Sequence, residues 1–328
     1  MPLTTRTRVL AIAAAGAVLA AIAVGYTVRA AGRADPGPPA ASRVAPANTP
    51  GLYLRTATGT VAAQQVSPAG RRDTALSCHR FYASGGTAVC LTTKPGLPPR
   101  TRALVLDGEL RTRQTVDFGG TPNRARVSPS GRMVSWTVFV SGDSYATSAF
   151  STRTGILDTR TGYLIKNMEP IQLYLDGRRV RAPDVNYWGV TFTRDDNRFY
   201  ATASTGGRTY LIEGDLRAWT ARNLRTNVEC PSLSPDGSRI AFKKRVRDGA
   251  DNPWQLHVLD LATMRETPLA DTRSVDDQAA WLDDRTVAYA VPDADGSPDI
   301  WSVPADGSGT PRLVSRGASS PSMVPATE

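Results

Sequence analysis

The sequence predicts an all-β fold, a six-bladed β-propeller of four-stranded antiparallel blades, preceded by an N-terminal transmembrane helix and a linker. Three observations predict the propeller. A turn phrase recurs along the chain, a second phrase follows some of its copies, and residues 51–328 give enough chain for the ring. Six blades of ~45 residues need about 270 residues.

The first phrase is an apolar strand end, a tight polar turn and an alternating strand. Val127-Ser-Pro-Ser-Gly131 and Leu233-Ser-Pro-Asp-Gly237 are its clearest copies, and Phe192–Asn197 and Trp281–Asp284 are looser copies without the proline. Pro presets φ for the first turn position, Asp or Ser bonds to the turn backbone, and Gly accepts positive φ. Each copy therefore predicts a β-hairpin.

The second phrase predicts the outer half of a blade. Trp254–Asp260, Asp299–Val303 and Tyr210–Glu213 read as third strands, each followed by a turn and a fourth strand. Four antiparallel strands per repeat are typical of a propeller blade. The turns near positions 130, 195, 236 and 283 have the ~40–50-residue spacing of blades, except the first interval. That interval contains extra strand-like sequence at 163–165 and 171–175, which predicts an insertion.

The two ends of the propeller region predict one complete blade and one split blade. Residues 76–91 form a hairpin around Ser84-Gly85-Gly86, and 101–106 and 113–118 supply its outer strands. Residues 51–55 and 60–66 read as outer strands without an inner pair. Ser319–Val324 resembles the start of another inner strand. Pairing of this last segment with the first strands would close the ring and remove its open edges.

The N-terminal region predicts export and anchoring. Val9 to Val28 are twenty uncharged residues, and a helix of that length spans roughly 30 Å, the thickness of a bilayer core. Arg6 and Arg8 before it favour an N-terminus inside the cell. We expect residues 1–29 to be a cytoplasmic stub and transmembrane signal-anchor (helix about 9–28), 30–50 a Pro/Ala-rich linker, and 51–328 the propeller. The propeller would then be extracytoplasmic on a single-pass membrane protein, or secreted if the segment is cleaved.

The charge distribution argues against nucleic acid. The net charge is +9, but part of it precedes residue 51 and the rest is dilute, whereas nucleic-acid binders cluster their basic residues. The densest basic groups, 243–247 and 178–181, have no interleaved aromatic residues. We expect them to be a solvated rim, with contact to anionic lipid or wall polymer as the alternative. We also expect a monomer.

These phrases resemble the WD-like repeats of TolB-type propellers, most strongly over 225–315, fairly over 120–225 and weakly over 51–120. The repeats also resemble those of propeller domains in prolyl oligopeptidase relatives. The resemblance implies the fold and no particular function. TolB carries an additional N-terminal α/β domain. Only a linker is expected before this propeller, so the resemblance does not extend to the assembly role of TolB.

The reactive residue types favour structural roles. No Gly-x-Ser-x-Gly elbow is present, and of the two histidines His257 lies mid-strand and His79 adjoins Cys78. Cys78 and Cys90 lie on opposite arms of a hairpin, so outside the membrane a disulfide between them is expected, unless strand registry prevents it. Cys230 is expected to be a small buried hydrophobe.

Two aspartate-rich loops resemble parts of calcium sites. Asp293-Ala-Asp295-Gly-Ser-Pro-Asp299 carries oxygen ligands at alternate positions, and Asp248–Asn252 occupies the equivalent loop one blade earlier. Both also suit ordinary hairpin turns. We expect plain turns and no cofactor, with calcium as the alternative.

Propellers usually bind at a rim or at the channel mouth, where the inner strands begin. The candidates by position are polar or aromatic side chains that could form a pocket, or could instead line the channel and bond to one another. They are Arg124, Arg126, Tyr187, Trp188, Glu229, Asp276, Asp277 and Gln278. We therefore expect a non-catalytic binding or scaffolding module whose partner is a protein or another envelope component. The alternative is an enzyme of lyase or lactonase type in the channel, using carboxylates and a divalent ion.

Overall fold

The computed structural model describes residues 49–64, 70–96, 100–140, 151–247, 253–293 and 295–326. All of them lie within one compact unit, Val44–Glu328. The helix expected at 9–28 and most of the linker lie outside these residues. Among the residues described, no helix has the length and apolar character that crossing a membrane requires.

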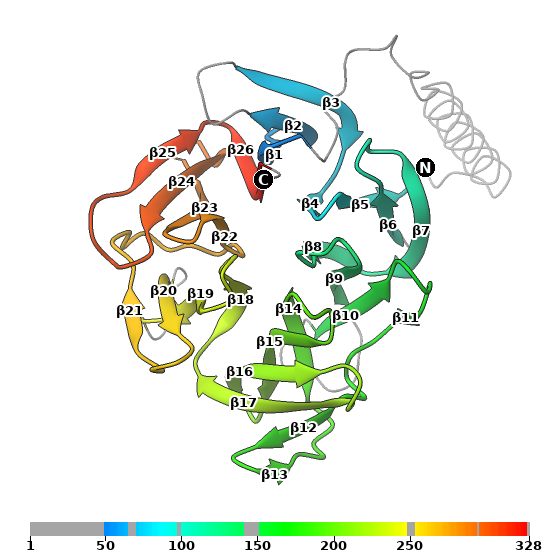
Figure 1. Cartoon of the computed structure of the whole chain (residues 1–328), viewed down its shortest axis with the longest axis vertical. Coiled ribbons are helices and arrows are strands. Elements are labelled where there is room, and N and C mark those ends of the chain that lie inside the picture. Colours follow the sequence, from blue (N-terminus) through cyan, green and yellow to red (C-terminus); the bar gives the residue numbers. More distant parts are fainter. Residues whose placement is uncertain are drawn as a thin grey trace, which may run out of the picture. The chain divides into compact units, whose positions relative to one another are not determined.

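The described residues form six sheets around a central channel, which confirms the predicted six-bladed β-propeller (Figure 1). The innermost strand of each sheet faces the channel and lies beside the innermost strands of both neighbouring sheets. These six strands are β26, β4, β8, β14, β18 and β22, with bounds given below. Because each blade follows the same order, all six inner strands begin at the same mouth of the channel.

Blades 2 and 3 each consist of four antiparallel strands in chain order. The blade 2 hairpin turns at Gly85 and Gly86, whose φ values of 55° and 73° suit a two-residue turn. The strands of blade 2 are β4 (Arg80–Ser84), β5 (Thr87–Lys94), β6 (Arg100–Leu106) and β7 (Thr112–Gly119). Those of blade 3 are β8 (Thr121–Val127), β9 (Met133–Val140), β10 (Ser151–Asp158) and β11 (Leu164–Ile165).

Blade 4 carries the predicted insertion. Its sheet has six strands, because the hairpin β12–β13 adds to its outer edge and β12 pairs in parallel with β17. This parallel pair departs from the all-antiparallel prediction, although the four basic strands of the blade are antiparallel. The strands are β12 (Gln172–Leu175), β13 (Arg178–Arg179), β14 (Asn186–Phe192), β15 (Arg198–Thr205), β16 (Arg208–Asp215) and β17 (Thr220–Thr226).

Blade 5 contains a clear copy of each sequence phrase, and blade 6 contains a looser copy of the first phrase and a clear copy of the second. In the first turn of blade 5 the amide of Gly237 donates to the carbonyl of Ser234, and the carboxylate of Asp236 accepts from the Ser238 amide at 3.0 Å. The strands of blade 5 are β18 (Glu229–Leu233), β19 (Arg239–Arg245), β20 (Trp254–Asp260) and β21 (Glu266–Pro268). Those of blade 6 are β22 (Ala280–Asp283), β23 (Thr286–Pro292), β24 (Pro298–Pro304) and β25 (Arg312–Ser315).

Blade 1 joins the two ends of the propeller. Its order is β26-β1-β2-β3, so the last strand of the chain is the innermost strand and pairs antiparallel with the first. The sequence predicts this split blade, with 51–55 and 60–66 as its outer strands. In the structure these two are the second and third strands of the blade, and a strand that the sequence did not predict is the outermost one. That strand begins with three exposed charged residues and so reads as a loop. The strands are β26 (Ala318–Val324), β1 (Gly51–Thr56), β2 (Thr60–Gln64) and β3 (Arg71–Ser77).

Apolar side chains fill the layers between blades and within them. Phe118 of blade 2 stacks on Trp136 of blade 3, with ring centroids 5.3 Å apart. In blade 4 the fully buried ring of Phe199 lies over Gly214, where a Cβ atom would come within 2.0 Å of the ring. These contacts bury the apolar face of each strand and fix the angle between neighbouring blades.

Candidate functional site

The channel opens into a cavity of about 560 Å³ at the mouth where the inner strands begin. Arg80 opens β4, Asn186 opens β14 and Glu229 opens β18, and all three side chains line the cavity. Arg124 reaches it from β8, and Asp276 from the segment before β22. These five residues belong, in their order along the chain, to blades 2 to 6, so five blades contribute to one polar recess.

Two buried cations form one wall of this cavity. The side chains of Arg124 and Lys243 are 8 % and 4 % exposed, whereas the side chain of Asp276, which contacts both, is 71 % exposed. Lys243 forms an ion pair with Asp276, and Arg124 Nη2 lies 3.7 Å from an oxygen of the same carboxylate. The cations are therefore fixed in the fold, while the carboxylate that neutralises them faces solvent.

Aromatic rings border the same wall. Lys243 Nζ lies 4.4 Å from the ring centroid of Trp254, and the Arg245 guanidinium lies 4.8 Å from it, both within range of a cation–π contact. Trp188 lines the cavity from β14 and is half-buried. Glu169 and Asp184 also line the cavity, so the recess carries further carboxylates besides those beside the two cations.

Burial and charge move the pKa values of two neighbouring carboxyl groups in opposite directions. Burial raises the pKa of Glu229 above its ordinary value, although Lys243, 3.9 Å away, opposes this shift. Partial loss of water against the two cations acts to raise the pKa of the exposed Asp276, but the charges of Lys243 and Arg124 outweigh it and hold that pKa below its ordinary value. Arg80 has a lowered pKa because burial outweighs its attraction to Asp277.

The structure brings half of the predicted site residues together at the cavity. Arg124, Trp188, Glu229 and Asp276 line it. Three others line a smaller chamber of the channel, of about 20 Å³, where their hydrogen bonds and ion pairs are to residues outside the predicted set: Arg126, Asp277 and Gln278. For example, the Gln278 amide donates to the Pro231 carbonyl at 2.9 Å.

Tyr187 does not belong to the site. Its side chain is 2 % exposed and packs in the core of blade 4, where its hydroxyl donates to the Ile171 carbonyl at 3.1 Å. Successive side chains of a strand point to opposite faces, so Tyr187 and Trp188 could not both face the channel. Burial raises the pKa of the Tyr187 hydroxyl.

Sequence reasoning missed Arg80, Asn123, Lys243 and Trp254, which also line the cavity. Lys243 was placed in a solvated basic rim, and this was wrong, because its side chain is buried. The hairpin gave no signal for it. Counting outward from the turn at 234–237 pairs Glu229 with Phe242, whereas the structure pairs Glu229 with Lys243, with a register shift between Glu229 and Ser232. Arg80 had a signal, since it opens β4 as Glu229 opens β18, but Trp254 lies on the third strand of its blade and had none.

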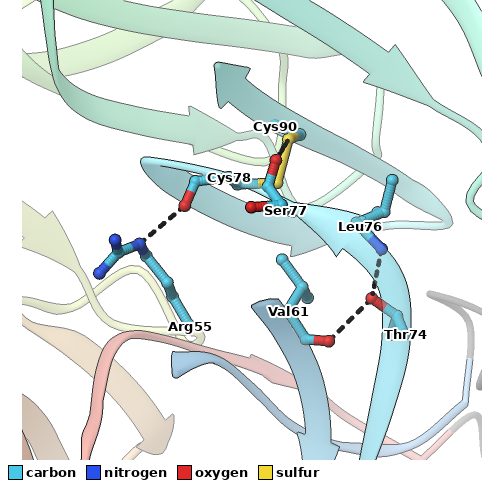
Figure 2. Close-up of a disulfide and its surroundings, with 7 residues drawn as sticks. All are labelled: Arg55, Val61, Thr74, Leu76, Ser77, Cys78 and Cys90. Carbon is cyan, nitrogen blue, oxygen red and sulfur yellow. Dashed lines mark hydrogen bonds between the residues drawn. A yellow bond between two sulfur atoms is a disulfide. The ribbon is translucent and has the colours of Figure 1, made fainter. Parts of the chain in front are cut away.

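Cys78 and Cys90, the pair considered for a disulfide, are joined by one in the structure, with their Cα atoms 5.5 Å apart (Figure 2). Cys78 lies in the short link from β3 to β4 rather than on a hairpin arm, and Cys90 lies in β5. The Cys78 carbonyl accepts from Arg55 Nε at 2.7 Å. The disulfide thus fastens the crossing from blade 1 into blade 2.

The other reactive residues take the structural positions expected of them. His257 is buried beside Glu266, its Nδ1 atom 2.8 Å from that carboxylate, and His79 is exposed and bonds to Thr93 at 3.0 Å. Cys230 is a buried free thiol that also borders the cavity. Its φ of 49° is unusual for a side-chain-bearing residue.

The aspartate loop of blade 6 forms a turn. The Ser297 amide donates to Asp295 at 2.7 Å, and Asp299 accepts instead from the Gly317 amide at 2.8 Å. The equivalent loop at 248–252 lies outside the described residues. In the part of the chain that the structure describes, no three His, Cys, Asp or Glu side chains gather so that they could hold a metal ion.

Comparisons with known proteins agree on the fold. No protein-family model matches the chain, and no curated protein matches it. Among solved structures, TolB from Acinetobacter baumannii has a TM-score of 0.61 at 17% identity, over 84% of this chain and 66% of that chain. A TolB candidate from Agrobacterium tumefaciens has a TM-score of 0.51 at 14% identity, over 82% and 90%. A chain of the nidogen/laminin complex has a TM-score of 0.52 at 10% identity, over 84% and 99%. This chain therefore spans about two thirds of the A. baumannii protein and has a TolB-like six-bladed propeller fold.

Proposed function

We propose that this protein is an extracytoplasmic, membrane-anchored propeller that binds a protein or another component of the cell envelope at the mouth of its channel, without chemical turnover. The supporting observation is the ionic wall of the cavity. An exposed carboxylate, Asp276, neutralises two buried cations, Arg124 and Lys243. An acidic group of a partner could take the place of Asp276 against these cations while the strands that hold them stay in position.

The surroundings of this wall suit a partner of some size. The cavity of about 560 Å³ accepts several side chains or sugar units, and Trp188 offers apolar surface beside the charged groups. Arg124 is held on β8 and Lys243 on β19 of a closed ring, so little ordering is required of the protein on binding. We infer that the partner presents an acidic group flanked by apolar surface.

Two features support a location outside the cytoplasm. The twenty uncharged residues of 9–28 suit a membrane segment with the propeller beyond it. The disulfide between Cys78 and Cys90 is a bond that persists in oxidising compartments and is rare in the cytosol. Fusion of a reporter that is active only outside the cytoplasm to the C-terminus tests this location, and an inactive but stable fusion would contradict it.

Site-specific crosslinking in the native host tests binding. A photo-crosslinking amino acid replaces Trp188 at the cavity or, as a control, Tyr163, which is 66% exposed in the turn before β11. We expect one or a few partners to be captured from position 188 and not from position 163. Equal capture from both positions, or none from 188, would contradict a binding site at the mouth.

One observation favours a second candidate, an enzyme acting in the channel. Glu229 and Asp276 both interact with Lys243, and their pKa values move in opposite directions, as those of a general acid and base do. A lyase or lactonase would use such a pair. The test is to incubate the full chain with lactones and acidic polysaccharides, with calcium or with a chelator. Turnover that Glu229→Gln abolishes would replace the binding proposal.

A further inference from the structure

The channel contains a second, much smaller chamber beside the mouth cavity. It measures about 20 Å³, and Arg80 and Arg124 line both spaces. A space of this size holds one water molecule or one single-atom ion. Side chains from β4, β8 and β26 and from the segment before β22 surround it, so four blades meet there.

Buried polar atoms without a hydrogen-bond partner are concentrated around this chamber. Within the described residues such atoms occur in five side chains, and His257 is one of them. The other four atoms all belong to residues that line the chamber: Arg124 Nε, Arg126 Nε, Asp277 Oδ2 and Ser320 Oγ. Buried polar groups in folded proteins nearly always have a partner. The two Nε atoms are donors and the Ser320 hydroxyl can donate, so three of the four could donate to an anion, whereas Asp277 Oδ2 requires a donor. Their gathering at one point indicates a polar occupant.

The charge of the chamber indicates the sign of that occupant. Three guanidinium groups line it, from Arg80, Arg124 and Arg126, against one carboxylate, Asp277. That carboxylate lies 3.8 Å from Arg80, and Arg124 lies 3.7 Å from Asp276. Both of these arginines therefore have an acidic neighbour, and the remaining positive charge is that of Arg126.

Arg126 is 4 % exposed, and no carboxylate of the described residues forms an ion pair with it. Its contacts are neutral. One terminal nitrogen donates to Ser232 Oγ at 3.1 Å and to the Ala279 carbonyl, and its guanidinium lies 4.3 Å from the ring centroid of Tyr82. A buried charge without a counter-charge is strongly unfavourable. A water molecule would satisfy hydrogen bonds here but would not neutralise the charge.

We propose that the chamber binds one small monovalent anion of the halide class, held by Arg126 and Arg124. The small volume excludes sulfate, phosphate and carboxylates. The ion would neutralise Arg126 at a point where blades 1, 2, 3 and 6 meet, and it would therefore stabilise the closed ring. This proposal does not depend on what the mouth cavity binds.

Bromide provides the direct test. Crystals of the full chain grown without halide are soaked in sodium bromide, and the anomalous signal of bromine is measured. We expect a bromide peak beside Arg126 in the unaltered chain. Electron density for water alone in the chamber, with bromide peaks only on the surface, would overturn the proposal.

Thermal unfolding gives a second test. At equal pH and ionic strength, bromide or chloride should raise the melting temperature over acetate, which is too large for the chamber, by at least about 2 °C. Arg126→Met should abolish this difference, whereas Arg312→Met on the exposed outer strand β25 should keep it. An equal halide effect in both variants would contradict the site. If Arg126→Met does not fold, the bromide peak in the unaltered chain decides.

Discussion

The layers between the blades and the channel at their centre are both buried, but they are built from different side chains. Rings such as Phe118 and Trp136 meet face to face between blades, and aliphatic residues fill the space around them. The channel holds guanidinium, ammonium and carboxyl groups instead. Arg124 and Asp276, for example, come from blades far apart in the sequence. The difference teaches where each property resides: the layers supply stability, and the channel supplies a preformed charged surface.

A core truncation should give the largest effect on stability. Phe199→Ala removes a fully buried ring over Gly214 and leaves a cavity that the surrounding strands cannot fill. We expect the free energy of unfolding to fall by about 3–5 kcal/mol, measured by chemical denaturation. Tyr163→Ala, an aromatic truncation at an exposed position, should change it by less than about 0.5 kcal/mol. A loss below about 1 kcal/mol for Phe199→Ala would show that the layers contribute less than we infer.

Removing the disulfide should have the next largest effect. Replacing Cys78 and Cys90 together by Ala opens a loop of 12 residues and frees the crossing between blades 1 and 2. We expect a loss of about 2–3 kcal/mol in the same denaturation measurement. A reducing agent should lower the stability of the unaltered chain by a similar amount and leave the double variant unchanged. A reductant effect on the double variant would mean that another bond is responsible.

A channel variant should leave stability nearly unchanged and remove binding. Lys243→Met takes away a buried ammonium that has two acidic neighbours. Asp276 is exposed enough to be hydrated alone, and Glu229, whose pKa burial already raises, can take up a proton. We expect a stability change below about 1 kcal/mol, because loss of the buried charge offsets loss of the ion pair. Crosslinking from position 188 should fall at least about tenfold, which corresponds to about 1.4 kcal/mol of binding.

Lys244→Met is the matched control for that variant. Lys244 follows on the same strand, points to the other face and pairs with Glu266 outside the cavity. It should keep full crosslinking. If crosslinking falls equally in both lysine variants, the overall positive charge of the protein rather than the cavity determines binding. The channel would then not be the binding surface that distinguishes it from the layers.

The smallest effect should be a pH dependence from His257. Burial lowers its pKa below the ordinary value of 6.5, although Glu266 opposes the shift. The unfolded chain therefore binds the proton first. This contribution to stability is complete above about pH 6.5 and declines as the pH falls toward the folded-state pKa. The free energy of unfolding should differ less between pH 7.5 and pH 5.5 in His257→Phe than in His79→Gln. Equal differences would exclude His257 as the source.

Local chemistry explains why most of the fold could be predicted. The turn at 234–237 is specified by four adjacent residues, and the alternating strand after it follows the same rule in every blade. The insertion in blade 4 and the closure by residues 319–324 were visible as extra or missing strands in this pattern. The outer strand β3 was missed because Arg71, Arg72 and Asp73 are exposed and lack the apolar alternation that identifies a strand.

The candidate site was harder to predict, because its contacts join residues from different blades. Position within a blade sufficed to place Arg124, Trp188, Glu229 and Asp276 at the mouth. The same rule could have placed Arg80, which opens β4 as Glu229 opens β18. It could not separate Tyr187 from Trp188 without the face that each residue adopts, nor place Trp254, which reaches the cavity from the third strand of blade 5 through the curvature of the ring. Burial of Lys243 also depends on this curvature, since the same residue in an isolated hairpin would be exposed.

The position of β26 has a consequence for biogenesis. The innermost strand of blade 1 is the last of the described strands to be synthesised, yet it pairs with the first. Until it emerges, β1 has an unpaired edge beside the channel and the neighbouring blades lack one side of their packing. Folding of the ring must therefore wait until β26 has been synthesised. During that interval the open edge of β1 is where a chaperone would be needed most.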